Sequence, residues 1–377
     1  MSHGATSPVS FHMPGHKGKS FYVENGYGEF LDEIMNCDIT EIPGADNLFQ
    51  AEEVIRVTMD KYKNLYESKE SYLLINGSSA GILAAILSSV SKGGKLVMAR
   101  NCHKSAFNAL SLGDITPVYA FPGIVEEYGI LGEVSASEIA TCLDENPDAE
   151  AVILPSPNYY GICSDIKTIA EEVHKRGKIL IVDQAHGAHL KFFKEKHGFP
   201  KPAEMQGADI VINSIHKTLG SFGQTALLNV CSDRVDLIAL EDKLQIVESS
   251  SPSYPMMATL DINADILIND GEKLTALAEK LETALEKENR RKKKNEHLIK
   301  ILQNDIELLK EGIPPRARDR YLNLMYDASF CGLDYISEDA IIFIDDYYRI
   351  RDFVGREKKR ELDDVKSLIH GGYLLPD

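Results

Sequence analysis

Lysine, histidine and serine side chains stand together in the hexapeptide Asn213-Ser214-Ile215-His216-Lys217-Thr218. Apolar runs at 208–212 and 225–230 flank it. A lysine just past a buried strand, beside a serine and a histidine, is typical of a lysine that bonds to a cofactor aldehyde near a phosphate. The alternative is a solvent-exposed lysine in a loop. A short motif alone does not separate these two interpretations.

A carboxylate ends another apolar run, at Asp183 in Ile181-Val182-Asp183-Gln184-Ala185-His186-Gly187-Ala188-His189. A carboxylate at the end of a hydrophobic strand is costly unless it is paired. The cationic ring nitrogen of a cofactor would supply such a partner. His186 and His189, three positions apart, also allow a metal site. Because no HExxH motif and no cysteine or carboxylate cluster accompanies them, we predict that the protein binds no metal.

Two further polar segments follow strand-like runs. Asn76–Gly81 is rich in small residues and opens a helix, so its backbone N–H groups could approach a phosphate. An ordinary helix N-cap at Ser78 or Ser79 is an equally good local interpretation. His103, in Arg100–Ser105, is either a surface histidine or an aromatic plate against a ligand ring.

The elements that would position these residues alternate along the chain. Strand-like runs lie at 72–75, 95–99, 116–120, 149–154, 178–182, 208–212 and 225–230, and helical stretches at 51–67, 79–91, 103–112, 136–145 and 166–176. This alternation predicts an α/β fold with a mostly parallel sheet covered on both faces. Ligands of such sheets bind at the carboxyl ends of the strands, where all of the polar segments above are expected.

Composition limits the partners of the chain. With 377 residues and a net charge of −17, its surface should repel nucleic acid and anionic membranes. The basic run at 290–294 lies in a charged helical pattern and is interpreted as a solvated face. The six cysteines form no CxxC pair, and no run approaches the length of a membrane span. We therefore predict a cytoplasmic protein without a nucleic-acid or membrane partner.

Three parts are expected: an N-terminal arm at 1–50, a large ligand-binding domain at 51–255, and a helical linker with a small C-terminal α/β domain at 256–377. Proline and glycine exclude a regular helix from Phe11–Gly18 in the arm. Long helices are expected over 256–310, and a small α/β piece at 333–344 and 350–368.

Eight motifs occur together in one order: FHMPGHKG, DITEIPGADN, NGSSAG, RNCHKSAFNAL, SPNYYG, VDQAHGAH, SIHKT and SPSYP. In this the chain resembles the ornithine/lysine/arginine decarboxylases over residues 11–270. These are pyridoxal-phosphate enzymes with the aspartate-aminotransferase fold, fold type I. The resemblance implies that fold for the large domain, with a shortened and divergent C-terminal region.

The resemblance also implies a role for each matched residue. Lys217 would hold the cofactor as a Schiff base, Asp183 would pair with the pyridine nitrogen, and His103 would stack on the ring. Ala185 would pack on the other ring face. The phosphate would be held by Ser78, Ser79, Ala80, Ser214 and His216, and by Ser249 from a neighbouring subunit. A homodimer or a higher homo-oligomer follows from that last assignment.

The implied reaction is decarboxylation of arginine, lysine or ornithine to the amine, as in polyamine biosynthesis. Another pyridoxal-phosphate reaction, by a lyase, racemase or aminotransferase, stays open, as does a non-catalytic regulatory homologue of a longer decarboxylase. Gln184 stands where the family has glutamate, which we expect to remove a charge beside the cofactor. An acidic pocket for a basic substrate side chain has three candidates in the arm: Asp38, Glu41 and Asp46.

Overall fold

The computed structural model describes residues 19–192, 200–289 and 296–310, and the chain divides into two units, Met1–Ile268 and Asn269–Asp377. The long helix α10 (Tyr254–Asn289) begins in the first unit and ends in the second, whose other described element is α11 (Glu296–Lys310). Within the described ranges, no helix has the length and apolar character needed to cross a bilayer.

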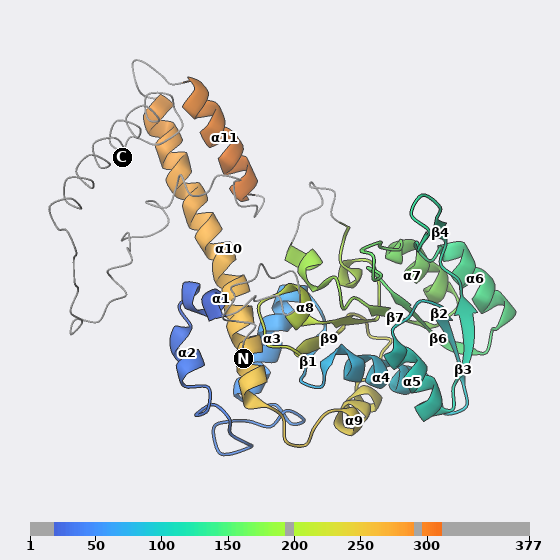
Figure 1. Cartoon of the computed structure of the whole chain (residues 1–377). Coiled ribbons are helices and arrows are strands. Elements are labelled where there is room, and N and C mark those ends of the chain that lie inside the picture. The colour runs from blue at the N-terminus through green and yellow to red at the C-terminus, as the bar shows by residue number, and fades with distance from the viewer. Residues whose placement is uncertain (1–18, 193–199, 290–295, 311–377) are drawn as a thin grey trace, which may run out of the picture. The chain divides into compact units, whose positions relative to one another are not determined.

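A seven-stranded sheet forms the centre of the first unit (Figure 1), in the order β1-β9-β8-β7-β6-β2-β3. The strands are β1 (Glu70–Leu74), β2 (Lys95–Ala99), β3 (Thr116–Ala120), β6 (Ala149–Pro155), β7 (Ile179–Asp183), β8 (Ile210–Asn213) and β9 (Ala226–Val230). Only β9 runs against its neighbours, pairing antiparallel with both β1 and β8. The other strands therefore share one direction, and their carboxyl ends meet at one edge of the sheet.

Helices cover both faces of this sheet. Figure 1 shows α4 (Gly77–Ser89), α5 (Lys104–Gly113) and α9 (Leu237–Val247) along one face, and α6 (Ala136–Glu145) and α7 (Ile166–Lys175) along the other. The side of each crossover helix follows from the right-handed rule for parallel strands, since α5 leads outward to β3 whereas α6 and α7 lead back toward β7. The remaining α-helices in the described part of this unit are α1 (Lys19–Glu24), α2 (Gly28–Asp32), α3 (Val54–Tyr66) and the short α8 (Ile215–Thr218).

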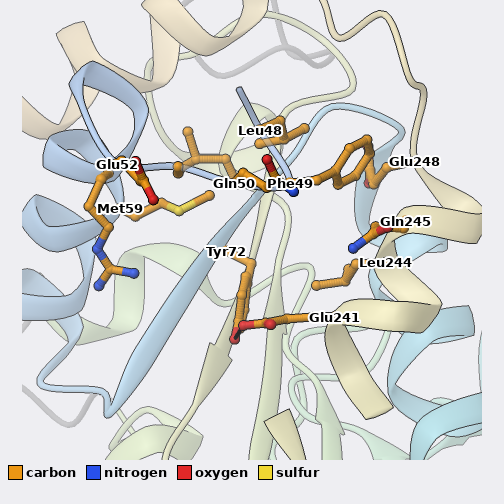
Figure 2. Close-up of a pocket in the computed structure, with 13 residues that line it drawn as sticks. Leu48, Phe49, Gln50, Glu52, Met59, Tyr72, Glu241, Leu244, Gln245 and Glu248 are labelled. Atoms are coloured by element: carbon orange, nitrogen blue, oxygen red, sulfur yellow. Dashed lines mark hydrogen bonds between the residues drawn. The ribbon is translucent and has the colours of Figure 1, made fainter. Parts of the chain in front are cut away.

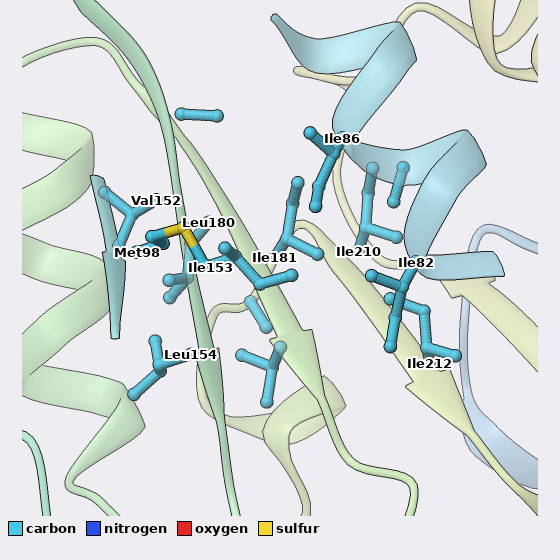
Figure 3. Packing of buried hydrophobic residues seen from close by; sticks show 14 of the residues in the cluster. Ile82, Ile86, Met98, Val152, Ile153, Leu154, Leu180, Ile181, Ile210 and Ile212 are labelled. Carbon is cyan, nitrogen blue, oxygen red and sulfur yellow. The ribbon is translucent and has the colours of Figure 1, made fainter. Parts of the chain in front are cut away.

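The core lies between the sheet and these helices, as Figure 3 shows for Ile82 and Ile86 of α4 beside Ile210 and Ile212 of β8. The inner strands are apolar on both faces, as expected where helices cover both sides of a parallel sheet. Gly81 lets α4 approach closely, because a Cβ there would lie 2.6 Å from Leu74 Cδ1 and 3.3 Å from Ile212 Cγ2. This packing fixes the start of α4 against the carboxyl ends of β1 and β8.

The described part of the arm packs on its own chain. Tyr22 of α1 is buried, and its ring meets Phe30 and Phe222. Ile262 and Ile266 of α10 complete this small cluster. The arm is therefore held by apolar burial, with two short helices that its irregular sequence does not predict.

The α/β fold predicted from the sequence is confirmed, with all seven strands at the expected places. The short hairpin β4 (Ile124–Val125) and β5 (Ile130–Leu131) was not expected. The predictions for Phe11–Gly18, the basic run 290–294 and the segments 333–344 and 350–368 lie outside the described residues.

Candidate active site

A cavity of about 210 Å³ lies where the carboxyl ends of β1, β2, β6, β7 and β8 meet. Its walls include Ser78, Asn101, His103, Asp183, Ala185 and Lys217. Ser78 follows β1, Asn101 and His103 follow β2, Asp183 and Ala185 end or follow β7, and Lys217 follows β8, so the sheet assembles the site from segments far apart in the chain. A cavity of this size suits one small ring rather than a large ligand.

Lys217 reaches this cavity from α8, the single helical turn after β8. Its Nζ lies 3.2 Å from Nε2 of His186. Burial lowers the pKa of Lys217, while the nearby carboxyl group of Asp183 opposes the shift. A lysine with a lowered pKa carries more of its neutral amine at physiological pH, which is the form that attacks an aldehyde.

Asp183 ends β7 and is only 7% exposed. Its Oδ1 accepts a hydrogen bond of 3.1 Å from the backbone N–H of Ala185. Burial raises the pKa of Asp183, although that N–H and the charge of Lys217 act in the opposite direction. A buried carboxylate with one hydrogen bond is stabilised by a cation, and a protonated ring nitrogen in the cavity would be one.

The turn between β1 and α4 forms the anion-binding end of the site. Gly77 has a φ of +80°, a conformation that favours glycine, and α4 begins there without a side-chain cap from Asn76. The first N–H groups of this 13-residue helix are thus available to an anion. Ser214 Oγ donates to Ser78 Oγ at 2.8 Å, which joins the turn to the segment that carries Lys217.

The alternative of a serine N-cap is therefore wrong, since the helix begins before Ser78 and its N-cap residue is Asn76. Ser79 is exposed on the first turn of α4, whereas Ala80 is buried in the core. Of the three residues expected at the phosphate here, only Ser78 lines the cavity.

His103 is the N-cap of α5, and its Nδ1 accepts a hydrogen bond from the backbone N–H of Ser105 at 3.3 Å. Burial lowers the pKa of His103, and the charge of Asp183 opposes this. The ring is therefore neutral at physiological pH and, with Nδ1 accepting, carries its proton on Nε2. A neutral imidazole on the cavity wall can stack on a ring and exchange a proton.

Three more of the expected phosphate ligands, Ser214, His216 and Ser249, lie outside the cavity wall. His216 Nδ1 donates to the Thr225 carbonyl at 2.8 Å, and burial lowers the pKa of His216. Ser249 forms a local turn, with its Oγ 3.2 Å from the carbonyl oxygen of Ser251. The reach of Ser249 to a neighbouring subunit stays a prediction.

Asn101, His186 and Tyr159 also line the cavity, and none of them is assigned to cofactor binding from the sequence. Asn101 Oδ1 is buried without a hydrogen-bond partner, so a ligand donor would satisfy it. The rings of Tyr159 and His186 meet edge to face at 6.1 Å. The available signal was position, because Asn101 lies two residues after the end of β2 and His186 lies three residues after Asp183.

The metal alternative gains no support from His186, whose Nε2 faces the lysine amine. Among the described residues, no group of three or more histidine, cysteine, aspartate or glutamate side chains is arranged to hold a metal ion.

Gln184 corrects an expectation. Its side chain does not line the cavity but enters a buried polar network on the other side of β7. Its Nε2 donates to Glu204 Oε2 at 2.9 Å and to Asn213 Oδ1 at 3.0 Å, and its Oε1 accepts from Ala203 N at 2.7 Å. Glutamine at 184 therefore changes the charge of this network rather than the charge that faces the cavity.

Replacing Gln184 by glutamate is expected to destabilise the fold by about 1–3 kcal/mol at neutral pH, because a donor is lost and the new buried carboxyl group faces that of the partly buried Glu204. Burial and the second carboxyl raise the folded-state pKa of the new group above its unfolded value. The cost is therefore small near pH 4 and grows as pH rises. Thermal unfolding of Gln184→Glu across pH 4–8 measures this, with Gln206→Glu as the control on the partly exposed turn. Equal pH dependence of the two variants would contradict the placement of Gln184.

Asp46 is also corrected as a candidate for binding a substrate. Its carboxylate accepts hydrogen bonds from the backbone N–H groups that open α3, including those of Glu53 at 2.9 Å and Ile55 at 3.0 Å. Burial raises the pKa of Asp46, but these backbone bonds outweigh it and the pKa is lowered. Asp46 thus serves as a helix cap, and neither Asp38 nor Glu41 lines the cavity.

The fold is the one shared by a class of proteins, the pyridoxal-phosphate-dependent enzymes of fold type I. Lysine decarboxylase A from Pseudomonas aeruginosa superposes with a TM-score of 0.55 at 20% identity, covering 77% of this chain and 43% of that one. A serine palmitoyltransferase from S. paucimobilis, solved with bound PLP, has a TM-score of 0.52 at 15% identity, covering 74% and 68%. At these identities the likeness shows the fold alone.

The chain belongs to the Orn/Lys/Arg decarboxylase family, whose major-domain model matches residues 1–345. It is 36% identical over 286 residues to the uncharacterized protein YaaO of Bacillus subtilis, covering 75% of this chain and 59% of that protein. It is 30% identical over 273 residues to an arginine decarboxylase of Bacillus subtilis, covering 72% and 55%. The chain thus spans less than two thirds of the length of either relative.

Proposed function

We propose that the protein binds pyridoxal phosphate at Lys217 and decarboxylates a basic amino acid: arginine, lysine or ornithine. The observation that carries this proposal is the meeting of the Lys217 amine and the buried Asp183 carboxylate in one cavity, beside the Ser78 turn. Membership of the decarboxylase family supports the reaction class. Arginine and lysine decarboxylases among the relatives support the choice of substrates to test.

The residues of the site fit the cofactor at three points. The neutral amine of Lys217 is suited to bond with its aldehyde, Asp183 to hold a proton on its ring nitrogen, and the N-terminus of α4 to bind its phosphate. When bound, the cofactor supplies an electron sink for the pair released as carbon dioxide leaves.

The two histidines handle protons in this scheme. Burial lowers the pKa of His186, and the charge of Lys217 adds to the shift, so both His186 and His103 are neutral near pH 7. His186, at 3.2 Å from the lysine amine, can accept its proton. His103 Nε2–H, on the cavity wall, can donate a proton to the substrate carbon after carbon dioxide departs.

A substrate panel tests the proposal. The cofactor content of the purified protein is measured first from its absorbance, and release of carbon dioxide is then measured with arginine, lysine and ornithine. We expect release from one of them, with the matching amine as product. Cofactor-loaded protein that releases carbon dioxide from no amino acid would refute decarboxylation.

Two other outcomes identify the alternatives. Products that keep the substrate carboxylate, detected by mass spectrometry, would indicate another reaction on the same scaffold. Inactivity combined with co-purification of a longer decarboxylase would indicate a regulatory homologue. We further propose a cytoplasmic homodimer in which Ser249 reaches the site of the neighbouring subunit. Loss of cofactor affinity in Ser249→Ala would support that arrangement.

A further inference from the structure

A second and larger cavity, of about 560 Å³, lies between α3, α9 and the segment 48–52 (Figure 2). Its residues are entirely different from those of the Lys217 cavity. Apolar walls come from Leu48, Phe49, Met59 and Leu244. Charged or polar groups come from Glu52, Arg56, Tyr72, Glu241, Gln245 and Glu248. The pocket therefore combines an apolar lining with several acidic groups.

Glu248 is the charged group of this pocket whose hydrogen bonds the surrounding protein does not complete. It is 7% exposed, and its Oε2 accepts hydrogen bonds from the backbone N–H groups of Ile75 at 3.2 Å and Asn76 at 3.0 Å. Its Oε1 is buried and has no hydrogen-bond partner. An unpaired buried carboxylate oxygen is costly, so a ligand that pairs with it gains that free energy.

The other charges leave the pocket with an excess of negative charge. Arg56, the one basic residue of the lining, is neutralised by Asp60 and Glu70, each 2.6 Å from its Nη2. Glu241 accepts a hydrogen bond of 2.7 Å from the hydroxyl group of Tyr72. Glu52 stands exposed at the rim. A cation is therefore the complementary ligand.

The apolar walls indicate which kind of cation. A hydrated metal ion prefers several oxygen ligands, and the described residues contain no such cluster. An organic cation with an alkyl chain would instead bury that chain against Met59 and Leu244 while its charged end meets Glu248.

We propose that this pocket binds a protonated aliphatic amine, whose ammonium group pairs with Glu248 Oε1 and whose alkyl chain contacts Met59 and Leu244. This site is separate from the Lys217 cavity and does not depend on the reaction carried out there.

Calorimetric titration of the full chain with 1,5-diaminopentane tests the proposal. The titration is made at pH 8, because burial raises the pKa of Glu248 to about 7 and the carboxylate is ionised above it. We expect binding of the diamine and no binding of 1,5-pentanediol, which has the same chain without charge. Glu248→Gln is expected to weaken binding about tenfold or more, the usual effect of losing a hydrogen bond to a charged group.

Further variants keep the test decisive if Glu248→Gln does not fold. Glu52 and Glu53 are both exposed, but only Glu52 lines the pocket. Glu52→Lys places a competing cation at the rim and is expected to weaken diamine binding, whereas Glu53→Lys should leave it unchanged. Lys217→Ala should also leave it unchanged, since that residue belongs to the other cavity.

Three results would overturn the proposal. The first is the absence of diamine binding by the unmodified chain. This result includes the case in which a second copy of the chain fills the pocket, which a dimer that Glu52→Lys dissociates would indicate. The second is binding that neither Glu248→Gln nor Glu52→Lys weakens. The third is binding that Lys217→Ala abolishes, which would place the diamine in the catalytic cavity.

Discussion

Lys217→Ala is expected to lose covalent attachment of pyridoxal phosphate and to lower decarboxylation by at least about a thousandfold, a loss of the size seen when a covalent nucleophile is removed. The reason is that alanine offers no amine to the cofactor aldehyde, while the rest of the cavity is unchanged. Borohydride reduction of the cofactor-saturated protein, followed by mass spectrometry of its peptides, measures the attachment directly. The label should be found on the peptide that contains Lys217.

Lys104→Ala is the matched control for this experiment. Lys104 is exposed and follows His103 directly, but it does not line the cavity. Its replacement should leave the labelling of Lys217 intact. If the label is found on Lys104 or another lysine, or persists in Lys217→Ala, the assignment of the cofactor site is wrong. Because the readout is labelling, the result holds whichever substrate the enzyme uses.

Asp183→Asn is the second change with a large expected effect. Asparagine keeps the shape of the side chain but removes the buried negative charge, so the ring nitrogen of the cofactor loses its anionic partner. Hydrogen bonds to charged groups contribute about 1.5–3 kcal/mol, which corresponds to a loss of cofactor affinity of about tenfold to more than a hundredfold. Catalysis should fall further, because an unprotonated ring withdraws electrons less strongly. Absorbance titration with pyridoxal phosphate gives the affinity, and single-turnover rates give the chemical step.

Asp165→Asn provides the comparison for this variant. Asp165 caps α7 from an exposed position, and asparagine caps helices about as well as aspartate. This control should bind the cofactor normally. Normal cofactor affinity and normal rates in Asp183→Asn would instead show that the carboxylate has a purely structural role at the end of β7.

The sequence is sufficient to predict the helix and sheet layers of the fold, because apolar runs and helical stretches alternate with clear boundaries. It did not predict that β9 inserts between β1 and β8 in the opposite direction. That placement depends on which strands pair, and the apolar pattern of β9 is compatible with any inner position in the sheet. The start of α4 was also missed, since Gly77 adopts a positive φ that no periodicity reports.

The main residues of the candidate site can also be predicted from the sequence, because Asp183 and Lys217 stand at or just after the ends of apolar strands. What the sequence did not predict was the direction of the side chains around them. Neighbouring residues alternate between the two faces of a strand, so Gln184 points away from the face used by Asp183. Its partner Glu204 lies 20 positions away, in a segment that gave no signal. The role of Asp46 is not visible in the sequence, because the five backbone N–H groups that donate to it belong to Asn47 and to the start of α3, which meet its carboxylate only in the folded chain.

The position of β9 has a consequence for how the chain folds. Ser71 of β1 and Asn229 of β9 share a hydrogen bond of 2.8 Å although they are 158 positions apart. During synthesis β1 emerges long before the strand that pairs with it, and such non-local pairing is slow. A nascent chain that stops before residue 226 leaves β1 without its neighbour and β8 with an open edge, and unpaired edges of this kind promote aggregation. Completion of the sheet, and with it the Ser78 turn beside Lys217, therefore awaits the synthesis of β9, the last strand of this sheet.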